Sequence, residues 1–315
     1  MFEDAANTIL LPHTPVKRQG KTASCWAFSV LSYLETECPG QEYAVWHLVR
    51  GKYMDLIRQA DRYPLRRMPS GALGHTAVSL LLQNGVLQLE EYPGKVPAVK
   101  AFRLFSKVAF MLHRTARLCP ATRTLSCCLL NRAMDLLWGK LPSHSSSVLH
   151  APVREKLEHL VELTSFAHLP YEEWHMLNLP DNYEQKPFYN LPLETLMNLL
   201  EDLLHHGHSF VWDGCLHGGY NMQTGTAILP QGTPVSESLR SQQFLQGTLT
   251  DDHMMHIIGL TRIDGQPYFI AKNSVGQAGP YQGLLCMHAD FLRMKTISVL
   301  VDSRDIQHLI RQNCQ

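Results

Sequence analysis

The spacing of apolar residues predicts helices in the first two thirds of the chain and strands in the last third. Apolar residues recur at helical spacing over 25–38, 43–58, 75–84, 99–118, 124–138, 152–163 and 193–206. Short apolar runs typical of strands follow at 209–213, 256–260, 267–271, 283–287 and 296–301. Between two of these runs, Asp264-Gly265 is a strong hairpin signal. Helices first and strands afterwards predict an α+β chain with segregated halves.

The chain of 315 residues is long enough for two subdomains with a sizeable core. We expect a helical subdomain at 1–94, an inserted helical block at 95–165 and a β-rich subdomain at 166–315. From Lys95 to His150 there are nine Lys and Arg residues and a single acid. Several of these basic residues share one face of the helix expected at 99–118. This basic face is either simply solvated or a docking surface for an acidic partner, RNA or lipid.

Overall composition indicates a compact globular protein. The 28 Lys and Arg residues balance the 28 Asp and Glu residues, so no global charge points to nucleic acid. The sequence contains no run of 18 apolar residues, so it predicts no membrane span. The start, Met1-Phe2-Glu3-Asp4, lacks the basic head and apolar core of a signal peptide, which favours a cytoplasmic location. A periplasmic or secreted location is the alternative if a leader has been removed.

One cysteine stands where a nucleophile would be activated. Cys25 opens the first predicted helix, and the unpaired N–H groups and dipole of a helix N-terminus favour a thiolate. Gln19, six residues earlier, lies where a loop could aim its side-chain N–H at an oxyanion beside the sulfur. The alternative is an inert cysteine that simply precedes a core helix.

A base and an orienting group for such a nucleophile are found near the hairpin. His253 leads directly into the first strand of the hairpin, and Asn273 follows the second. A histidine there can take the thiol proton, and an Asn across the hairpin can accept the imidazole N–H and fix its tautomer.

We expect neither a metal ion nor any other cofactor. The eight cysteines show no CxxC pair or zinc spacing. The histidines at 205, 206, 208 and 217 do not share one helix face and have no spaced carboxylate or cysteine cluster to complete a shell.

Residues 15–29 closely resemble the nucleophile segment of papain-like cysteine peptidases. The segments 163–168, 179–182 and 188–193 are similar to the bleomycin hydrolase / aminopeptidase C branch of that superfamily, which carries a helical insertion between its halves. The resemblance implies a papain-like two-subdomain fold, with a helical left half and an antiparallel, β-barrel-like right half.

The resemblance also implies roles for particular residues. Cys25 matches the nucleophile, His253 the base, Asn273 the residue that orients it, and Gln19 the oxyanion-hole glutamine, with the Cys25 backbone N–H as the second donor. Residues expected to contact substrate are Trp26, Ser70, Gly71, Ala72 and Asp252.

The chain departs from the family pattern at four positions. Thr22 replaces a disulfide cysteine of secreted relatives, which favours a reducing compartment or a lineage without disulfides. Ala72 replaces a glycine of the substrate cleft, and Cys215 replaces an acid. Val275 replaces the tryptophan that covers the His–Asn hydrogen bond in relatives, so we expect a wetter and weaker pair and reduced activity.

The sequence thus predicts a cysteine-type peptidase that acts on peptide substrates through a thioester acyl-enzyme. The branch's aminopeptidase habit and hexamer depend on a C-terminal arm, whereas residues 303–315 read as a short helix. Exopeptidase and endopeptidase action, and a homo-oligomer, therefore stay open, as does acyl transfer to an amine. The alternative from another class is a catalytically weakened papain-like protein that binds a peptide or protein.

Overall fold

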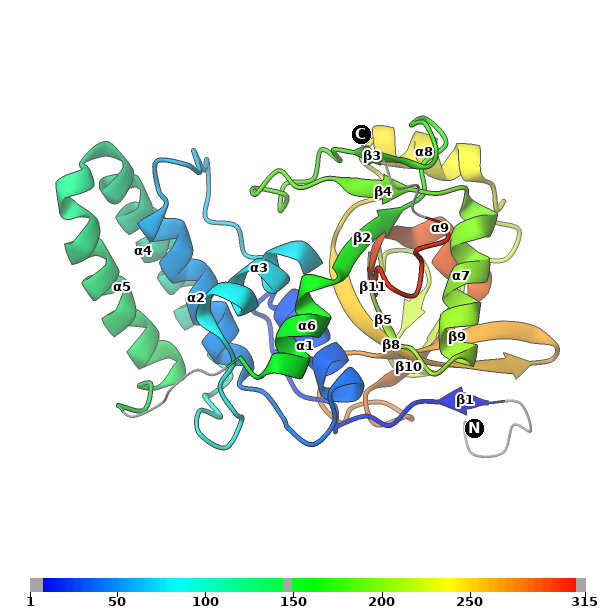
Figure 1. The fold of residues 1–315 in the computed structure, drawn as a ribbon, viewed down its shortest axis with the longest axis horizontal. Coiled ribbons are helices and arrows are strands. Elements are labelled where there is room, and N and C mark those ends of the chain that lie inside the picture. The colour runs from blue at the N-terminus through cyan, green and yellow to red at the C-terminus, as the bar shows by residue number, and fades with distance from the viewer. Residues whose placement is uncertain (1–7, 144–148, 310–315) are drawn as a thin grey trace.

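The computed structural model describes residues 8–143 and 149–309, with six helices on one side and a large sheet on the other (Figure 1). The first six helices are α1 (Cys25–Glu37), α2 (Val45–Arg58), α3 (Gly74–Asn84), α4 (Val99–Leu118), α5 (Arg123–Trp138) and α6 (Ala151–Glu158). The other three are α7 (Leu193–His205), α8 (Glu237–Leu245) and α9 (Ala289–Lys295). The strands are β1 (Ile9–Leu10), β2 (Leu160–Thr164), β3 (Glu173–His175), β4 (Phe188–Asn190), β5 (Phe210–Gly214), β6 (Tyr220–Asn221), β7 (Thr226–Ala227), β8 (His253–Ile263), β9 (Gln266–Lys272), β10 (Leu284–His288) and β11 (Thr296–Asp302).

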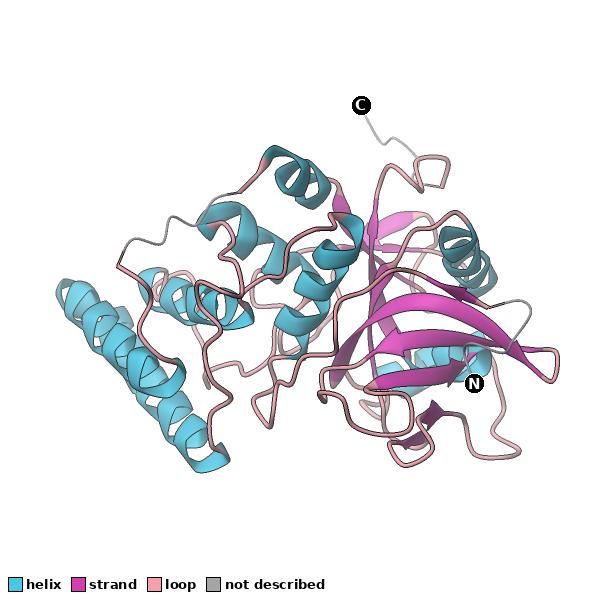
Figure 2. Cartoon of the chain, turned by 90° about the horizontal axis from the view of Figure 1, so that it is seen from below, coloured by secondary structure: helices cyan, strands magenta, loops and turns pink. Residues whose placement is uncertain are grey.

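The sheet runs in the order β3-β4-β2-β11-β5-β8-β9-β10-β7-β6, with β1 added beside β8. Figure 2 shows the strands gathered in one half of the molecule. Most neighbours are antiparallel, while the pairs β2/β4 and β10/β7 are parallel. The predicted hairpin is β8 and β9, and its turn residues Asp264 and Gly265 both have positive φ, as a tight hairpin turn requires.

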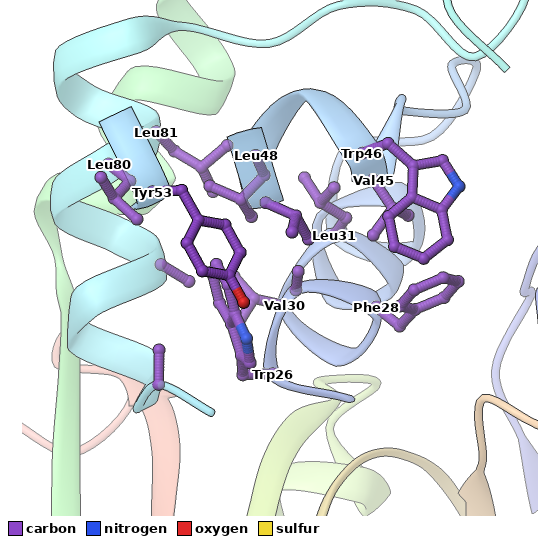
Figure 3. Close-up of a cluster of buried hydrophobic side chains, with 14 of the residues drawn as sticks. Trp26, Phe28, Val30, Leu31, Val45, Trp46, Leu48, Tyr53, Leu80 and Leu81 are labelled. Carbon is purple, nitrogen blue, oxygen red and sulfur yellow. The ribbon is translucent and has the colours of Figure 1, made fainter. Parts of the chain in front are cut away.

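Two large apolar cores stabilise the two halves. In the helical half, aromatic side chains link the helices. Phe28 of α1 meets Trp46 of α2 edge-on (Figure 3). Trp46 in turn stacks on Trp138 of α5. In the other half, α7 and α9 pack against the sheet through a second cluster. Along β8 the side chains alternate, so that Met254 joins the helical core while Met255 and Ile257 join the second.

Within the stretch 95–165, helices α4 and α5 form an antiparallel pair that packs on α2. The apolar face predicted for α4 is turned inward, with Phe102, Phe105 and Ala109 buried. The predicted basic face is exposed at Lys100, Arg103, Lys107 and Arg114. None of the helices within residues 8–143 and 149–309 is both long and apolar enough to cross a membrane.

Two predicted elements are wrong. The helix expected at 152–163 ends at Glu158, and Leu160–Thr164 forms strand β2, which pairs with β11. Pairing with a strand that is distant in sequence overrides the local helical spacing here. Residues 303–309 form successive turns, not the expected helix, and the rest of that stretch lies outside the described residues.

Candidate active site

The site forms where the N-terminus of α1 meets the start of β8. Cys25 is the first residue of α1 and His253 the first of β8. Two hydrogen bonds hold the helix against the strand: the Ser29 hydroxyl donates to the Met254 carbonyl at 2.8 Å, and the Ser32 hydroxyl lies 2.9 Å from Nδ1 of His256. These contacts fix the position of α1 along β8, and with it the position of the Cys25 thiol relative to the His253 imidazole.

Cys25, His253 and Asn273 form a connected group. Nε2 of His253 lies 2.8 Å from Oδ1 of Asn273, across the β8–β9 hairpin. The Cys25 thiol is within hydrogen-bonding reach of the same imidazole. Burial opposes charge on His253, but the hydrogen bond and charge of Cys25, together with the Asn273 amide, outweigh it and raise the pKa of His253 above its ordinary value. The surroundings therefore favour the charged imidazolium form of His253.

The side-chain amide of Gln19 is held in one orientation. Its backbone N–H donates to the Ser274 carbonyl at 2.9 Å, and the Ser274 hydroxyl donates to Gln19 Oε1 at 3.0 Å. Since Oε1 is occupied as an acceptor, Nε2 is the end of the amide left to donate, and Gln19 does not itself line the cavity beside the thiol. Sequence reasoning missed this contact of Ser274, although the residue follows Asn273 directly.

Tyr220 of β6 lies beside Asn273. The Asn273 amide Nδ2 lies 3.5 Å from the Tyr220 hydroxyl, and Asn273 is 6% exposed. Asn273 is therefore buried, while His253 is half-buried, and the wetter pair expected from Val275 stays a prediction. No pattern in the sequence singles out Tyr220, because it is distant from the hairpin along the chain.

A cavity of about 210 Å³ opens beside the thiol. Its walls bring together the predicted residues Cys25, Ser70, Gly71, Ala72, Asp252 and His253. A Cβ at position 71 would lie 2.0 Å from Oδ2 of Asp181, so a larger residue there would force the Asp181 carboxyl to move. Ala72 lines the wall and is buried.

Trp26 does not line this cavity, so its role as a substrate contact stays a prediction. Its side chain is 1% exposed and packs in the helical core beside Tyr53 (Figure 3). The reason is helix geometry, since the residue after Cys25 points about 100° away around α1. From there its ring faces the Lys52 ammonium at 5.4 Å.

Lys52 of α2 supports the cavity from behind. The side chain is fully buried, and Nζ donates to the carbonyl oxygens of Pro69 at 2.8 Å and Ser70 at 3.0 Å, and also to that of Gly71. Burial lowers the pKa of Lys52 to about 8. One ammonium thus ties down the loop that forms a wall of the cavity, a role that its sequence context did not reveal.

Three further carboxyl groups line the same cavity: Asp181, Asp213 and Asp251. Burial raises the pKa of Asp181, although Lys52 and Arg67 oppose the shift. Burial and the neighbouring Asp251 raise the pKa of Asp213 well above its usual range. Burial together with nearby acids raises the pKa of Asp251 to about 7. Sequence reasoning named only Asp252 as an acid of this site.

Among residues 8–143 and 149–309, no group of three or more His, Cys, Asp or Glu side chains is arranged to hold a metal ion. The cysteines in this part of the chain are all free thiols, and Cys119 and Cys128 are exposed.

The fold matches solved structures of known proteins. PepW from Lactobacillus rhamnosis HN001 superimposes with a TM-score of 0.72 over 96% of this chain and 84% of that chain, at 15% identity. More distant matches are the bromelain protease from Ananas comosus (TM-score 0.45, 13% identity, 92% of this chain and 93% of that one) and xylellain, a cysteine protease from Xylella fastidiosa (TM-score 0.46, 13% identity, 96% and 87%). No family model and no curated protein sequence matches this chain.

The likeness to PepW confirms the fold predicted from the sequence motifs. The chain has the α+β papain-like fold, with a helical half and a mainly antiparallel β half. At 15% identity the likeness establishes the fold alone, so the chemistry has to be inferred from the residues of the cavity.

Proposed function

We propose that this protein is a cysteine peptidase in which Cys25 is the nucleophile. The observation that carries the proposal is the Cys25–His253–Asn273 group: a thiol at a helix N-terminus, in reach of an imidazole whose far nitrogen is 2.8 Å from an amide oxygen, on the wall of a cavity. This is the arrangement that nucleophilic catalysis by a thiol requires.

In the proposed acylation step, the Cys25 thiolate attacks the carbonyl carbon of a peptide bond. The developing oxyanion accepts hydrogen bonds from Nε2 of Gln19 and from the backbone N–H of Cys25. As the tetrahedral intermediate collapses, the C–N bond breaks and the His253 imidazolium gives its proton to the leaving amine. The product of this step is a thioester on Cys25 and a free amine.

In deacylation, neutral His253 takes a proton from water while the water oxygen attacks the thioester carbonyl. The C–S bond breaks, the carboxylic acid leaves, and the thiolate–imidazolium pair is restored. Asn273 holds the imidazole in one tautomer through both steps. The buried Asn273 and the Tyr220 contact favour an active enzyme over a weakened binding module.

The proposal is tested by incubating the protein with a mixture of unblocked and N-acetylated peptides and identifying products by mass spectrometry. Cleavage that is lost in Cys25→Ser and His253→Ala but kept in Cys128→Ser is the expected result. Cys128 is a matched control because it is an exposed free thiol outside the cavity. New N-termini inside blocked peptides would indicate endopeptidase action, and stepwise loss of N-terminal residues aminopeptidase action. Cleavage that survives in Cys25→Ser would contradict the assignment of the nucleophile.

A further inference from the structure

The four acids of the cavity differ in how their charge is compensated. Oδ2 of Asp252 lies 3.3 Å from Nε2 of His217, and its Oδ1 accepts the Leu216 N–H. Asp181 is stabilised electrostatically by two cations, Lys52 and Arg67.

The remaining two acids, Asp213 and Asp251, form no ion pair within residues 8–143 and 149–309, although Arg67 and His253 line the same cavity. Asp213 is 2% exposed, and neither of its oxygens accepts a hydrogen bond from a donor group in the described part of the chain. Its neighbour is the Asp251 carboxyl, which adds to the effect of burial and raises the pKa of Asp213. Neighbouring buried carboxyl groups resist ionising together, so the pair favours a state that keeps one proton.

Arg67 and His253 also line the cavity, but the largest electrostatic influences on this pair make its charge more costly. They are Glu162 of β2, the Cys25 thiol of α1, and Asp181 and Asp252 of the cavity wall. Glu162 is already occupied, because it pairs with His75 Nδ1 and accepts the Gly74 N–H at 3.1 Å. Nothing within the described protein therefore neutralises the Asp213–Asp251 pair, although it borders a cavity large enough for part of a ligand.

We propose that the Asp213–Asp251 pair binds a cationic group of the substrate, an ammonium or a guanidinium, and so selects peptides that carry positive charge beside the scissile bond. This inference rests on the proposed peptidase function and names its substrate class. A cation that donates to both carboxyls satisfies the unpartnered oxygens of Asp213 and replaces repulsion with charge-assisted hydrogen bonds. A neutral side chain leaves the pair as it is.

Two sources of such a cation fit the cavity: the α-ammonium of a peptide N-terminus and the side chain of Lys or Arg. Either would lie close to Cys25 and His253, because all four side chains line one cavity. The first source predicts an aminopeptidase, and the second predicts cleavage next to basic residues.

The kinetic test compares matched reporter peptides. The first pair consists of N-acetylated dipeptide amides that differ at one residue, on the N-terminal side of the scissile bond. This residue is arginine in one peptide and citrulline, its neutral isostere, in the other. A second pair of neutral dipeptide amides differs only by a free or acetylated N-terminus. We expect kcat/KM to favour the cationic member of one pair by about tenfold or more, since a hydrogen bond to a charged group is worth this much. Preference within the first pair identifies a side-chain cation, and within the second an N-terminus.

The variants assign the preference to the pair. In Asp213→Asn and in Asp251→Asn the ratio of kcat/KM values should fall toward one. Glu90→Gln, which removes an exposed acid that does not line the cavity, should keep the ratio. The wild-type ratio should also shrink as the pH falls below about 7, where Asp251 gains a proton and the pair becomes neutral. Equal rates within both pairs, or an unchanged ratio in both Asn variants, would overturn the proposal.

A binding arm separates this inference from the proposed function. Calorimetry on Cys25→Ala protein measures the affinity for the arginine and citrulline peptide amides and for the free and acetylated neutral ones, without turnover. Tighter binding of the cationic member of a pair, lost when Asp213→Asn is added, supports the cation site. If binding shows this preference but the active protein cleaves no peptide, only the peptidase proposal fails. Cleavage with no discrimination in either arm means that the cation site is wrong and the peptidase proposal stands.

Discussion

The Asp213–Asp251 pair has a measurable effect on folding stability. Asp251 has an ordinary pKa of 3.8, and its surroundings in the folded chain raise it to about 7. The folded state therefore holds a proton between these two values that the unfolded state has released. Because the folded state binds more protons in this window, the free energy of unfolding falls as the pH rises from about 4 to 7. Asp251→Asn removes this penalty and should stabilise the protein.

The magnitude follows from the shift. About three pH units correspond to about 4 kcal/mol of penalty above pH 7, at 1.36 kcal/mol per unit. Two effects reduce this figure: without Asp251 the Asp213 carboxyl ionises more readily, and the Asp251 side chain is partly exposed. We therefore expect Asp251→Asn to stabilise the protein by about half of the penalty, or about 2 kcal/mol.

The assay is urea unfolding followed by tryptophan fluorescence, at about pH 4.5 and about pH 8. The variant should be more stable than wild type at the higher pH and nearly equal to it at the lower. Glu90→Gln should match wild type at both. A variant that is less stable at the higher pH, or shifted equally at both, would refute the account in which the folded pair keeps a proton.

Three other substitutions probe the supports of the site. Ser274→Ala frees the amide of Gln19 to rotate and should lower kcat/KM about tenfold, measured on any cleaved reporter; no loss would mean that the serine does not orient it. Asn273→Ala removes a hydrogen bond that raises the pKa of His253, so the alkaline limb of the pH–rate profile should move to lower pH by about half a unit; a shift to higher pH would contradict this sign. Lys52→Met leaves three loop carbonyls without a buried donor and should cost about 2 kcal/mol of stability and raise KM, read from unfolding and from initial rates; wild-type values for both would show that the ammonium does not hold the loop.

Sequence patterns predicted the parts of this structure that are encoded locally. Helix spacing gave α4 with its buried face, and the turn residues Asp264-Gly265 gave the β8–β9 hairpin. The positions of Cys25 and His253 at the start of their elements followed from short motifs in the same way.

The parts that were missed depend on contacts between distant segments. Strand β2 has helical spacing and becomes a strand only because β11 offers it backbone partners. Lys52 reads as one cation on a helix until the loop at 69–71 closes over it. Asp213 and Asp251 come from separate segments and become a pair only when β5 is aligned beside β8. Tertiary contacts of this kind leave no periodic trace in the sequence.

The most direct test of the central claim is the reactivity of Cys25 toward a papain-directed epoxide at mildly acidic pH, with the labelled cysteine mapped by mass spectrometry. An ordinary thiol, with a pKa of about 8.5, is almost fully protonated and unreactive there. The thiolate–imidazolium account predicts rapid single labelling at Cys25, lost in His253→Ala, while the exposed Cys119 and Cys128 stay unlabelled. No labelling, or slow labelling spread over several cysteines, would contradict it.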